Sequence, residues 1–169
     1  PTIPPSALIL EVIPGQVSIV YGNLHVAVEV RNTTDSWVQY IEVIMTFYDA
    51  DGEILKTAST YVLQNAVAPD STGIFEISVD VGSQAASIVA YEFKAYGQKA
   101  TSIPYQDLEL TARGGYFSSG YYHFPGEVKN TGSSDCQHTQ IIAGFYNAGG
   151  RIVRADFTYA NPDKVPAGS

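Results

Sequence analysis

The chain of 169 residues contains a single cysteine, and charged residues make up only 15% of it. One cysteine cannot form an internal disulfide, and it cannot supply the paired cysteines of a structural zinc site. Ordinary soluble proteins carry about 25% charged residues, so uncharged polar side chains and tyrosines must cover much of this surface. No apolar run approaches the ~20 residues of a membrane-spanning helix, and we expect no membrane-spanning segment.

Positive charge is scarce as well. The net charge is −8 and the isoelectric point is near 4.6, with 9 Lys/Arg against 17 Asp/Glu. Residues 1–98 hold 3 of the Lys/Arg and 11 of the Asp/Glu, so the first part of the chain carries the whole net charge. There is no basic run, and such a surface would repel the phosphates of a nucleic acid. We therefore expect no nucleic-acid partner.

The short motifs of common enzyme classes are missing. The chain has no Gly-x-Ser-x-Gly, Cys-x-x-Cys, His-Glu-x-x-His or phosphate-binding loop. It also offers no converging set of acid, base and nucleophile. We expect that the protein is not an enzyme and uses no cofactor.

What the sequence does contain is an internal repeat. A shift of 98 residues aligns residues 7–71 with 105–169 without a gap, and 20 of the 65 positions are identical. This predicts a Pro-rich lead-in at 1–6, a first module at 7–98, a linker at 99–104 and a second module at 105–169. Because the lead-in is typical of the tail of a stalk, we expect the chain to be a mature or trimmed form.

Alternation of apolar and polar residues indicates strands throughout both copies. Residues 24–31 alternate with a period of two, and the copy keeps that period, so the apolar positions of both are predicted to face a core. These positions are Leu24, Val26, Val28 and Val30 in the first copy, and Tyr122, Phe124, Gly126 and Val128 in the second.

Further strands are expected along the rest of the first copy. The longest is Trp37–Asp49, which Asp51-Gly52 turns into a hairpin, and two more are Gly73–Val81 and Ser87–Tyr96. Only a turn or so of helix is expected, around Ser83–Ala86. Many short strands with frequent turn signals predict an all-β protein of two tandem β-sandwich modules, each with about seven strands.

Several short motifs resemble one family. Glu29-Val30-x-Asn32, Met45–Asp49 followed by Asp51-Gly52, and Val67-x-Pro69-x-Ser71 are similar to the FxLYD-type immunoglobulin-like modules of bacterial and archaeal envelope proteins. The sequence departs from the pattern where Met45 and Ala143 replace Phe and where Asn147 replaces Asp. The resemblance implies immunoglobulin-like sandwiches at an extracellular or cell-surface location, and it implies no catalytic residues.

The aromatic stretch Arg113–Phe124 is the first candidate binding site. Tyr116, Phe117 and Tyr121 are predicted to contact a glycan or a neighbouring subunit, because exposed tyrosines bring large amphipathic area at low entropic cost. Tyr122 and Phe124 are predicted to belong to the core.

Other candidates are weaker. Asp49 and Asp51 could suggest a calcium loop, but the copy keeps the turn while losing the acids, which favours a hairpin. Asn32 begins the acceptor pattern for N-glycosylation, although turn chemistry also explains it. Cys136 replaces a valine and is expected to be a small buried residue; a metal or nucleophile pair with His138 is the alternative. His25 is expected to be solvated or paired across strands.

The second copy stops at the residue that matches Ser71. Strands equivalent to Gly73–Val81 and Ser87–Tyr96 are then missing from it, so its core and one sheet edge are expected to be open. Either the chain continues, or another polypeptide completes the sheet by strand addition.

The leading hypothesis is an extracellular structural or adhesive protein of repeated modules, acting as a self-assembling surface or filament subunit. Its partners would be other copies of itself or other cell-surface proteins. The alternative is a glycan-binding accessory module of a secreted or envelope protein, with polysaccharide as partner.

Overall fold

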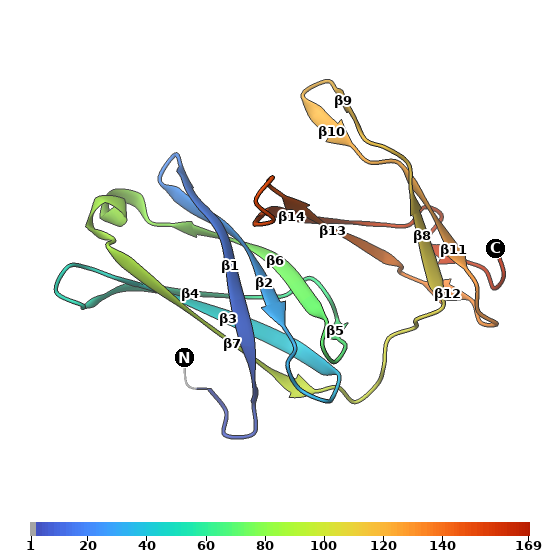
Figure 1. The fold of residues 1–169 in the computed structure, drawn as a ribbon, viewed down its shortest axis with the longest axis horizontal. Helices are drawn as coiled ribbons and strands as arrows, with labels where there is room; N and C mark the ends of the chain where they lie inside the picture. The colour runs from blue at the N-terminus through green and yellow to red at the C-terminus, as the bar shows by residue number, and fades with distance from the viewer. Residues whose placement is uncertain (1–2) are drawn as a thin grey trace. The chain divides into compact units, whose positions relative to one another are not determined.

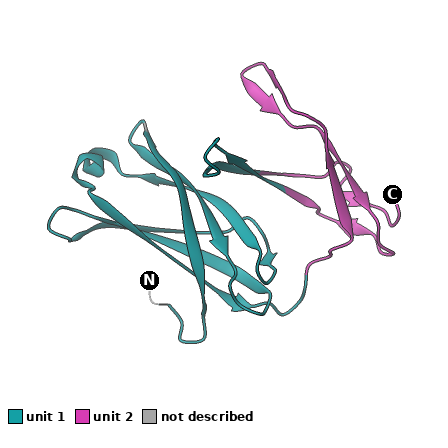
Figure 2. Cartoon of the chain, in the orientation of Figure 1, with its two compact units in different colours: residues 1–103, 142–156 teal, residues 104–141, 157–169 magenta. Residues whose placement is uncertain are grey.

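The computed structural model describes residues 3–169, so the first two residues of the Pro-rich lead-in lie outside the described part. Apart from one short 3₁₀ helix, the regular elements of the described residues are all strands (Figure 1). Two compact units are present, residues 1–103 with 142–156 and residues 104–141 with 157–169 (Figure 2). No helix of the described residues is long and apolar enough to cross a membrane. The prediction of an all-β protein is confirmed.

The elements of the first copy are closely those expected. They are β1 (Leu8–Val20), β2 (Asn23–Arg31), β3 (Val38–Tyr48), β4 (Ile54–Tyr61), β5 (Ala66–Val67), β6 (Thr72–Asp80), the short 3₁₀ helix η1 (Gly82–Ser87) and β7 (Ala90–Lys99). The helical turn expected near Ser83 is present as η1. The turns between the strands lie where the turn residues of the sequence predict them, because the conformational preferences of those residues act locally.

These strands form one curled antiparallel sheet. Its order is β4-β3-β7-β1-β2-β6, with β5 paired to β3. The long strand β1 joins the two halves: Leu8–Leu10 pair with β7, whereas residues 11–20 pair with β2. An irregularity in register between Pro14 and Val17 interrupts the second pairing. Irregularities of this kind bend a strand and increase its twist, which allows the sheet to curl around a core.

The core of unit 1 lies inside this curl. Val28, Val30, Val43, Met45 and Phe47 are fully buried, and the cluster also contains Phe75, Ile77 and Val79 of β6 and single residues of β1, β5 and β7. The named residues occupy alternate positions on their strands, so the period of two read from the sequence is the period of burial. Burying each large apolar side chain contributes roughly 1.5–3 kcal/mol before the cost of ordering the chain.

The second copy forms shorter strand pairs. Its strands are β8 (Leu108–Ala112), β9 (Tyr116–Ser118), β10 (Tyr121–His123), β11 (Gly126–Asn130), β12 (Cys136–Gln137), β13 (Gln140–Tyr146), β14 (Ile152–Tyr159) and β15 (Lys164–Val165). They pair as β8 with β11, β9 with β10, β12 with β15 and β13 with β14. Residues 142–156 of the second copy belong to compact unit 1.

Local geometry nevertheless recurs 98 residues on. Val12 pairs with Val30 as Leu110 pairs with Val128, and Val38 pairs with Val67 as Cys136 pairs with Val165. Backbone φ values also recur, at 50° for Tyr21 and 52° for Ser119, 50° for Tyr40 and 55° for His138, and 80° for Gly52 and 75° for Gly150. Both copies therefore use the same turns and the same pairing registers.

The prediction that Tyr122 and Phe124 belong to a core is wrong. They are 57% and 55% exposed, whereas their counterparts Leu24 and Val26 are 2% and 1% exposed. In unit 1, strands β6 and β7 complete the sheet around Leu24 and Val26. The described residues of unit 2 include no strands equivalent to β6 and β7, and Tyr122 and Phe124 of this alternating apolar face stay more than half exposed.

Candidate functional site

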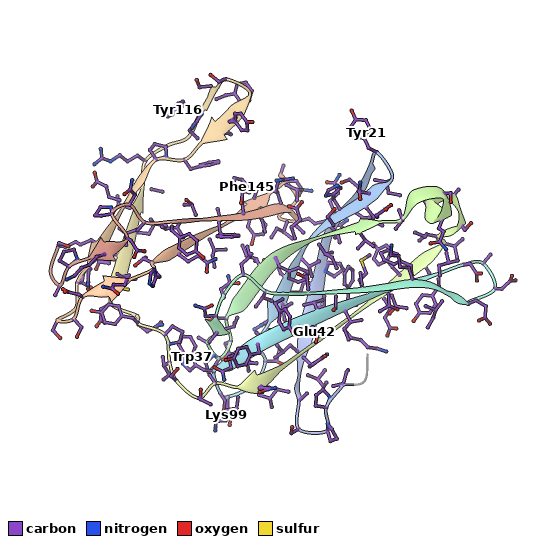
Figure 3. All side chains as sticks on the ribbon, turned by 180° about the vertical axis from the view of Figure 1, so that it is seen from behind. Tyr21, Trp37, Glu42, Lys99, Tyr116 and Phe145 are labelled. Carbon is purple, nitrogen blue, oxygen red and sulfur yellow. The ribbon has the colours of Figure 1, made fainter. Side chains whose placement is uncertain are left out.

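The aromatic residues singled out by the sequence lie on the β9–β10 hairpin of unit 2. Tyr116, Phe117 and Tyr121 are 55%, 70% and 73% exposed, and Figure 3 labels Tyr116 on this hairpin. The turn between the strands uses Ser119 and Gly120, both with positive φ. A two-residue turn with two positive φ angles matches the twist of the flanking strands, so it fixes their register.

These three aromatic residues do not share one face. Tyr116 pairs with His123, and their rings stack with centroids 5.0 Å apart. Phe117 pairs with Tyr122. Since cross-strand partners lie on one side of a sheet and sequence neighbours on opposite sides, Tyr121 shares the Tyr116 face and Phe117 lies on the other. Together they cannot form a single flat platform for a ligand.

Asn32 is a structural residue. Its side chain is fully buried, and Nδ2 lies 2.8, 3.0 and 3.1 Å from the carbonyl oxygens of Ser36, Val67 and Ala68. Its Oδ1 accepts hydrogen bonds from the N–H and the hydroxyl of Thr34. A glycan would be attached to Nδ2, and a buried nitrogen engaged with three carbonyls cannot carry one in the folded protein. The glycosylation candidate is therefore replaced by a turn-anchoring role.

Asn130 repeats this arrangement in unit 2. Its Nδ2 donates to the carbonyl oxygens of Ser134 and Val165 at 2.8 and 3.0 Å, and its Oδ1 accepts the N–H of Gly132 at 3.0 Å. It is fully buried like Asn32. Both copies have an asparagine at this position because its side chain has the same role in each. It holds a polar turn against a short strand, β5 in the first copy and β15 in the second.

The acidic turn after β3 uses its carboxylate locally. Asp49 Oδ1 accepts the backbone N–H groups of Asp51 and Glu53 at 3.0 and 2.9 Å. In the copy, Asn147 Oδ1 accepts two backbone N–H groups of its own turn at 3.0 and 3.1 Å. An amide thus does the same work as the carboxylate. Within the described residues, no group of three or more His, Cys, Asp or Glu is placed to hold a metal ion.

Cys136 and His138 have separate partners. Cys136 is half-buried rather than buried, and its Sγ lies 3.3 Å from the hydroxyl of Thr139. His138 is exposed, and its Nδ1 lies 3.1 Å from Asp163 Oδ1. The positive φ of His138 ends the alternation of β12. The geometry gives these two residues turn contacts rather than a shared reactive centre.

The outer face of β2 and β6 is covered within unit 1 by residues 142–156. Ala27 and Ile152 are each 1% exposed and pack in one small apolar cluster. Around it, Glu76 lies 3.4 Å from Arg154 Nη1 and 3.7 Å from His25 Nδ1. The cross-strand pairing expected for His25 is therefore present. No pattern in the sequence predicts the covering segment, because Ala27 lies among the residues that alternate on the polar face of its strand.

Tyr146 and Tyr96 have pKa values well above the ordinary one. Burial, followed by a 2.8 Å hydrogen bond to Glu29, raises the pKa of Tyr146 to about 12. A hydrogen bond to Glu42 is the main cause that raises the pKa of Tyr96 to about 12. In each case a phenolate beside a carboxylate would be repelled, so the neutral phenol is favoured.

We expect the free energy of unfolding to fall as the pH rises from 10 to 12. Tyrosines of the unfolded chain ionise near pH 10, whereas Tyr96 and Tyr146 stay neutral in the folded protein until about pH 12. The contribution of these two tyrosines to the free energy of unfolding is therefore complete below pH 10 and is lost as the pH rises through 12.

Near-ultraviolet absorbance of the phenolate measures this directly. The chain has 12 tyrosines, and some of them should ionise only near pH 12. The number of tyrosines that ionise near pH 12 should fall by one in Tyr146→Phe and by one in Tyr96→Phe. Tyr121→Phe removes an exposed phenol and serves as the control. Ionisation of Tyr96 and Tyr146 together with the exposed tyrosines near pH 10 would contradict the assignment.

Comparison of the chain with protein families, with curated proteins and with solved structures finds no match. The functional argument therefore rests on the residues and contacts described above.

Proposed function

We propose that the protein is an extracellular structural or adhesive protein of two immunoglobulin-like modules, and that it self-assembles at a cell surface by strand addition. Support comes from the sequence repeat, the low charge, and a surface rich in tyrosine and uncharged polar residues. The resemblance of both copies to envelope modules supports the location.

The observation that carries the proposal is the open apolar face of unit 2. Leu110, Tyr122 and Phe124 are 57%, 57% and 55% exposed. Their counterparts in unit 1 face the core. Exposed apolar side chains that alternate along paired strands form the kind of surface that marks a protein–protein contact.

The strand edges beside this face are also unpaired within the described chain. In unit 1, β6 pairs with β2 along its whole length, from Asn23 with Asp80 to Arg31 with Thr72. In unit 2, strand β11 is equivalent to the second half of β2, and it pairs only with β8. An exposed edge presents a row of unpaired N–H and C=O groups, and an added strand satisfies them.

The strand that fits this edge should resemble β6. Gly73, Phe75, Ile77 and Val79 of β6 are buried at alternate positions, so an added strand must present apolar residues with a period of two. A neighbouring copy that donated such a strand would make a head-to-tail contact. Contacts of this kind generate a filament when the rotation between copies does not close.

We expect the wild-type chain to form concentration-dependent oligomers, measured by light scattering after size-exclusion chromatography. Leu110→Lys and Tyr122→Lys should weaken this association about tenfold or more, which corresponds to roughly 1.4 kcal/mol for each factor of ten, because an ammonium would be buried in the apolar contact. Both side chains are exposed in the single chain, so its folding should be unaffected.

Tyr121→Lys is the matched control, since Tyr121 lies on the same strand and faces the other side. It should assemble like the wild type. A wild-type chain that stays monomeric at every concentration, or lysine variants that assemble equally well, would rule out strand addition at this face.

A further inference from the structure

A hollow in unit 1 lies where β3 changes its partner strand. From Glu42 onward β3 pairs with β4, whereas Val38 and Gln39 pair with β5. Residues 62–65 connect β4 to β5 and pass beside the change-over. The hollow has a volume of about 280 Å³, and the buried side chains of Ile41 and Val62 are part of its lining.

The main chain shapes this hollow. The register between β3 and β7 shifts between Gln39 and Glu42, and Tyr40 has a φ of 50°. Positive φ is uncommon for a bulky residue, and here it leaves Tyr40 67% exposed. Tyr61 at the end of β4 is 59% exposed and also lines the hollow.

The connecting loop is fixed before any ligand arrives. Val62 donates its N–H to the carbonyl oxygen of Ile41 at 3.0 Å, and Leu63 donates to Ile74 at 3.0 Å. Gln64 Oε1 accepts the N–H of Ile74 at 2.9 Å. That bond orients the Gln64 amide and leaves its NH₂ group as the donor. A loop held in place by such bonds loses little entropy on binding.

The lining combines two tyrosine rings with three carboxamides, those of Gln39, Gln64 and Asn65. A pyranose ring has apolar C–H faces that pack on aromatic rings, while its hydroxyl edges require hydrogen-bond donors and acceptors. A tyrosine supplies the aromatic ring at low entropic cost. A carboxamide supplies both a hydrogen-bond donor and a hydrogen-bond acceptor for the hydroxyl groups. The volume of about 280 Å³ lies just below the range for pockets that hold drug-sized ligands, about 300–1,000 Å³, and this suits a sugar ring better than a nucleotide cofactor.

The negative charge around the hollow distinguishes between neutral and acidic sugars as ligands. Glu42 is the cross-strand partner of Tyr61 and accepts a hydrogen bond from Tyr96. The surrounding residues 1–98 carry the whole net charge of −8. A uronic acid or a sulfated sugar would be repelled by this surface, whereas a neutral sugar would not.

The copy shows that the fold does not require this lining. His138 stands where Tyr40 does and has the same positive φ, and β12 pairs with β15 as β3 pairs with β5. Asp163 replaces Asn65, and its Oδ1 lies 3.1 Å from His138 Nδ1. The backbone is kept while the tyrosine and the carboxamide are replaced by a histidine and an aspartate in contact with each other.

We propose that the hollow between Tyr40 and Tyr61 is a binding site for a neutral polysaccharide. This site lies in unit 1 and does not depend on strand addition at unit 2, so either proposal can fail without the other.

Calorimetric titration of the full chain with mannan, with a neutral β-glucan and with alginate as the acidic polysaccharide tests the site. We expect at least one neutral polymer to bind and alginate not to bind. The double variant Tyr40→His/Asn65→Asp gives the hollow the residues of the copy, and it should lower the affinity by about tenfold or more. Tyr61→Ala should do the same.

Tyr121→Ala is the control on the aromatic hairpin and should bind as the wild type does. Thermal unfolding of each variant shows whether it is folded; Asn65→Ala, an exposed single change, replaces any variant that is not. The proposal is overturned if neither neutral polymer binds, if alginate binds more tightly, if the hollow variants bind like the wild type, or if only Tyr121→Ala loses binding.

Discussion

Replacing Asn32 by alanine is expected to lower the free energy of unfolding of unit 1 by about 3 kcal/mol. The substitution leaves the carbonyl oxygens of Ser36, Val67 and Ala68 without the donor that now lies 2.8–3.1 Å away. Leaving a buried acceptor unsatisfied costs about 1–3 kcal/mol each. Water can reach the carbonyls that lie nearer the surface, so the total stays below the full sum.

Urea unfolding followed by the fluorescence of Trp37, the only tryptophan, measures this loss in unit 1. Trp37, labelled in Figure 3, immediately precedes β3, whose first residue Val38 pairs with Lys99, and its carbonyl oxygen accepts the N–H of Ala100. The control is Thr33→Ala, an exposed change in the same turn, which should cost no more than about 0.5 kcal/mol. A loss below about 1 kcal/mol for Asn32→Ala would mean that the side chain does not hold the turn.

Replacing Phe47 by alanine is expected to cost about 4 kcal/mol. Phe47 is fully buried near the end of β3, and removal of its ring leaves a cavity that surrounding strands cannot fill. Its counterpart Phe145 is only half-buried, so Phe145→Ala should cost about half as much, because less apolar surface is lost from contact.

The same fluorescence transition measures the Phe47 effect, and calorimetry covers the Phe145 variant. Phe47→Leu keeps most of the volume and should cost about 1 kcal/mol, which separates the cavity from a general loss of fold. Equal losses for Phe47→Ala and Phe145→Ala would contradict the difference in burial between the two copies.

The strand positions were predictable to within a few residues. The predicted strand Trp37–Asp49 is β3, Val38–Tyr48, and the predicted strand Gly73–Val81 is β6, Thr72–Asp80. The hairpin at Asp51-Gly52 forms as expected. Periodicity and turn chemistry act between residues close in sequence, and local patterns report them directly.

The candidate sites were less predictable. Tyr116, Phe117 and Tyr121 are exposed, but pairing register places Phe117 on the opposite face. No pattern in the sequence predicts the hollow at Tyr40 and Tyr61. It depends on the point where β3 passes from β4 to β5 and on a positive φ in a tyrosine, for which residue type gives no warning.

The amino-acid sequence by itself determined the strands, the turns and the repetition of both at a distance of 98 residues, since each follows from neighbouring side chains. Only the tertiary structure decided which apolar faces are covered. Val26 is buried and its counterpart Phe124 is exposed, although both alternate in the same way. Burial depends on strands that arrive from elsewhere in the chain, and alternation along one strand carries no information about whether they do.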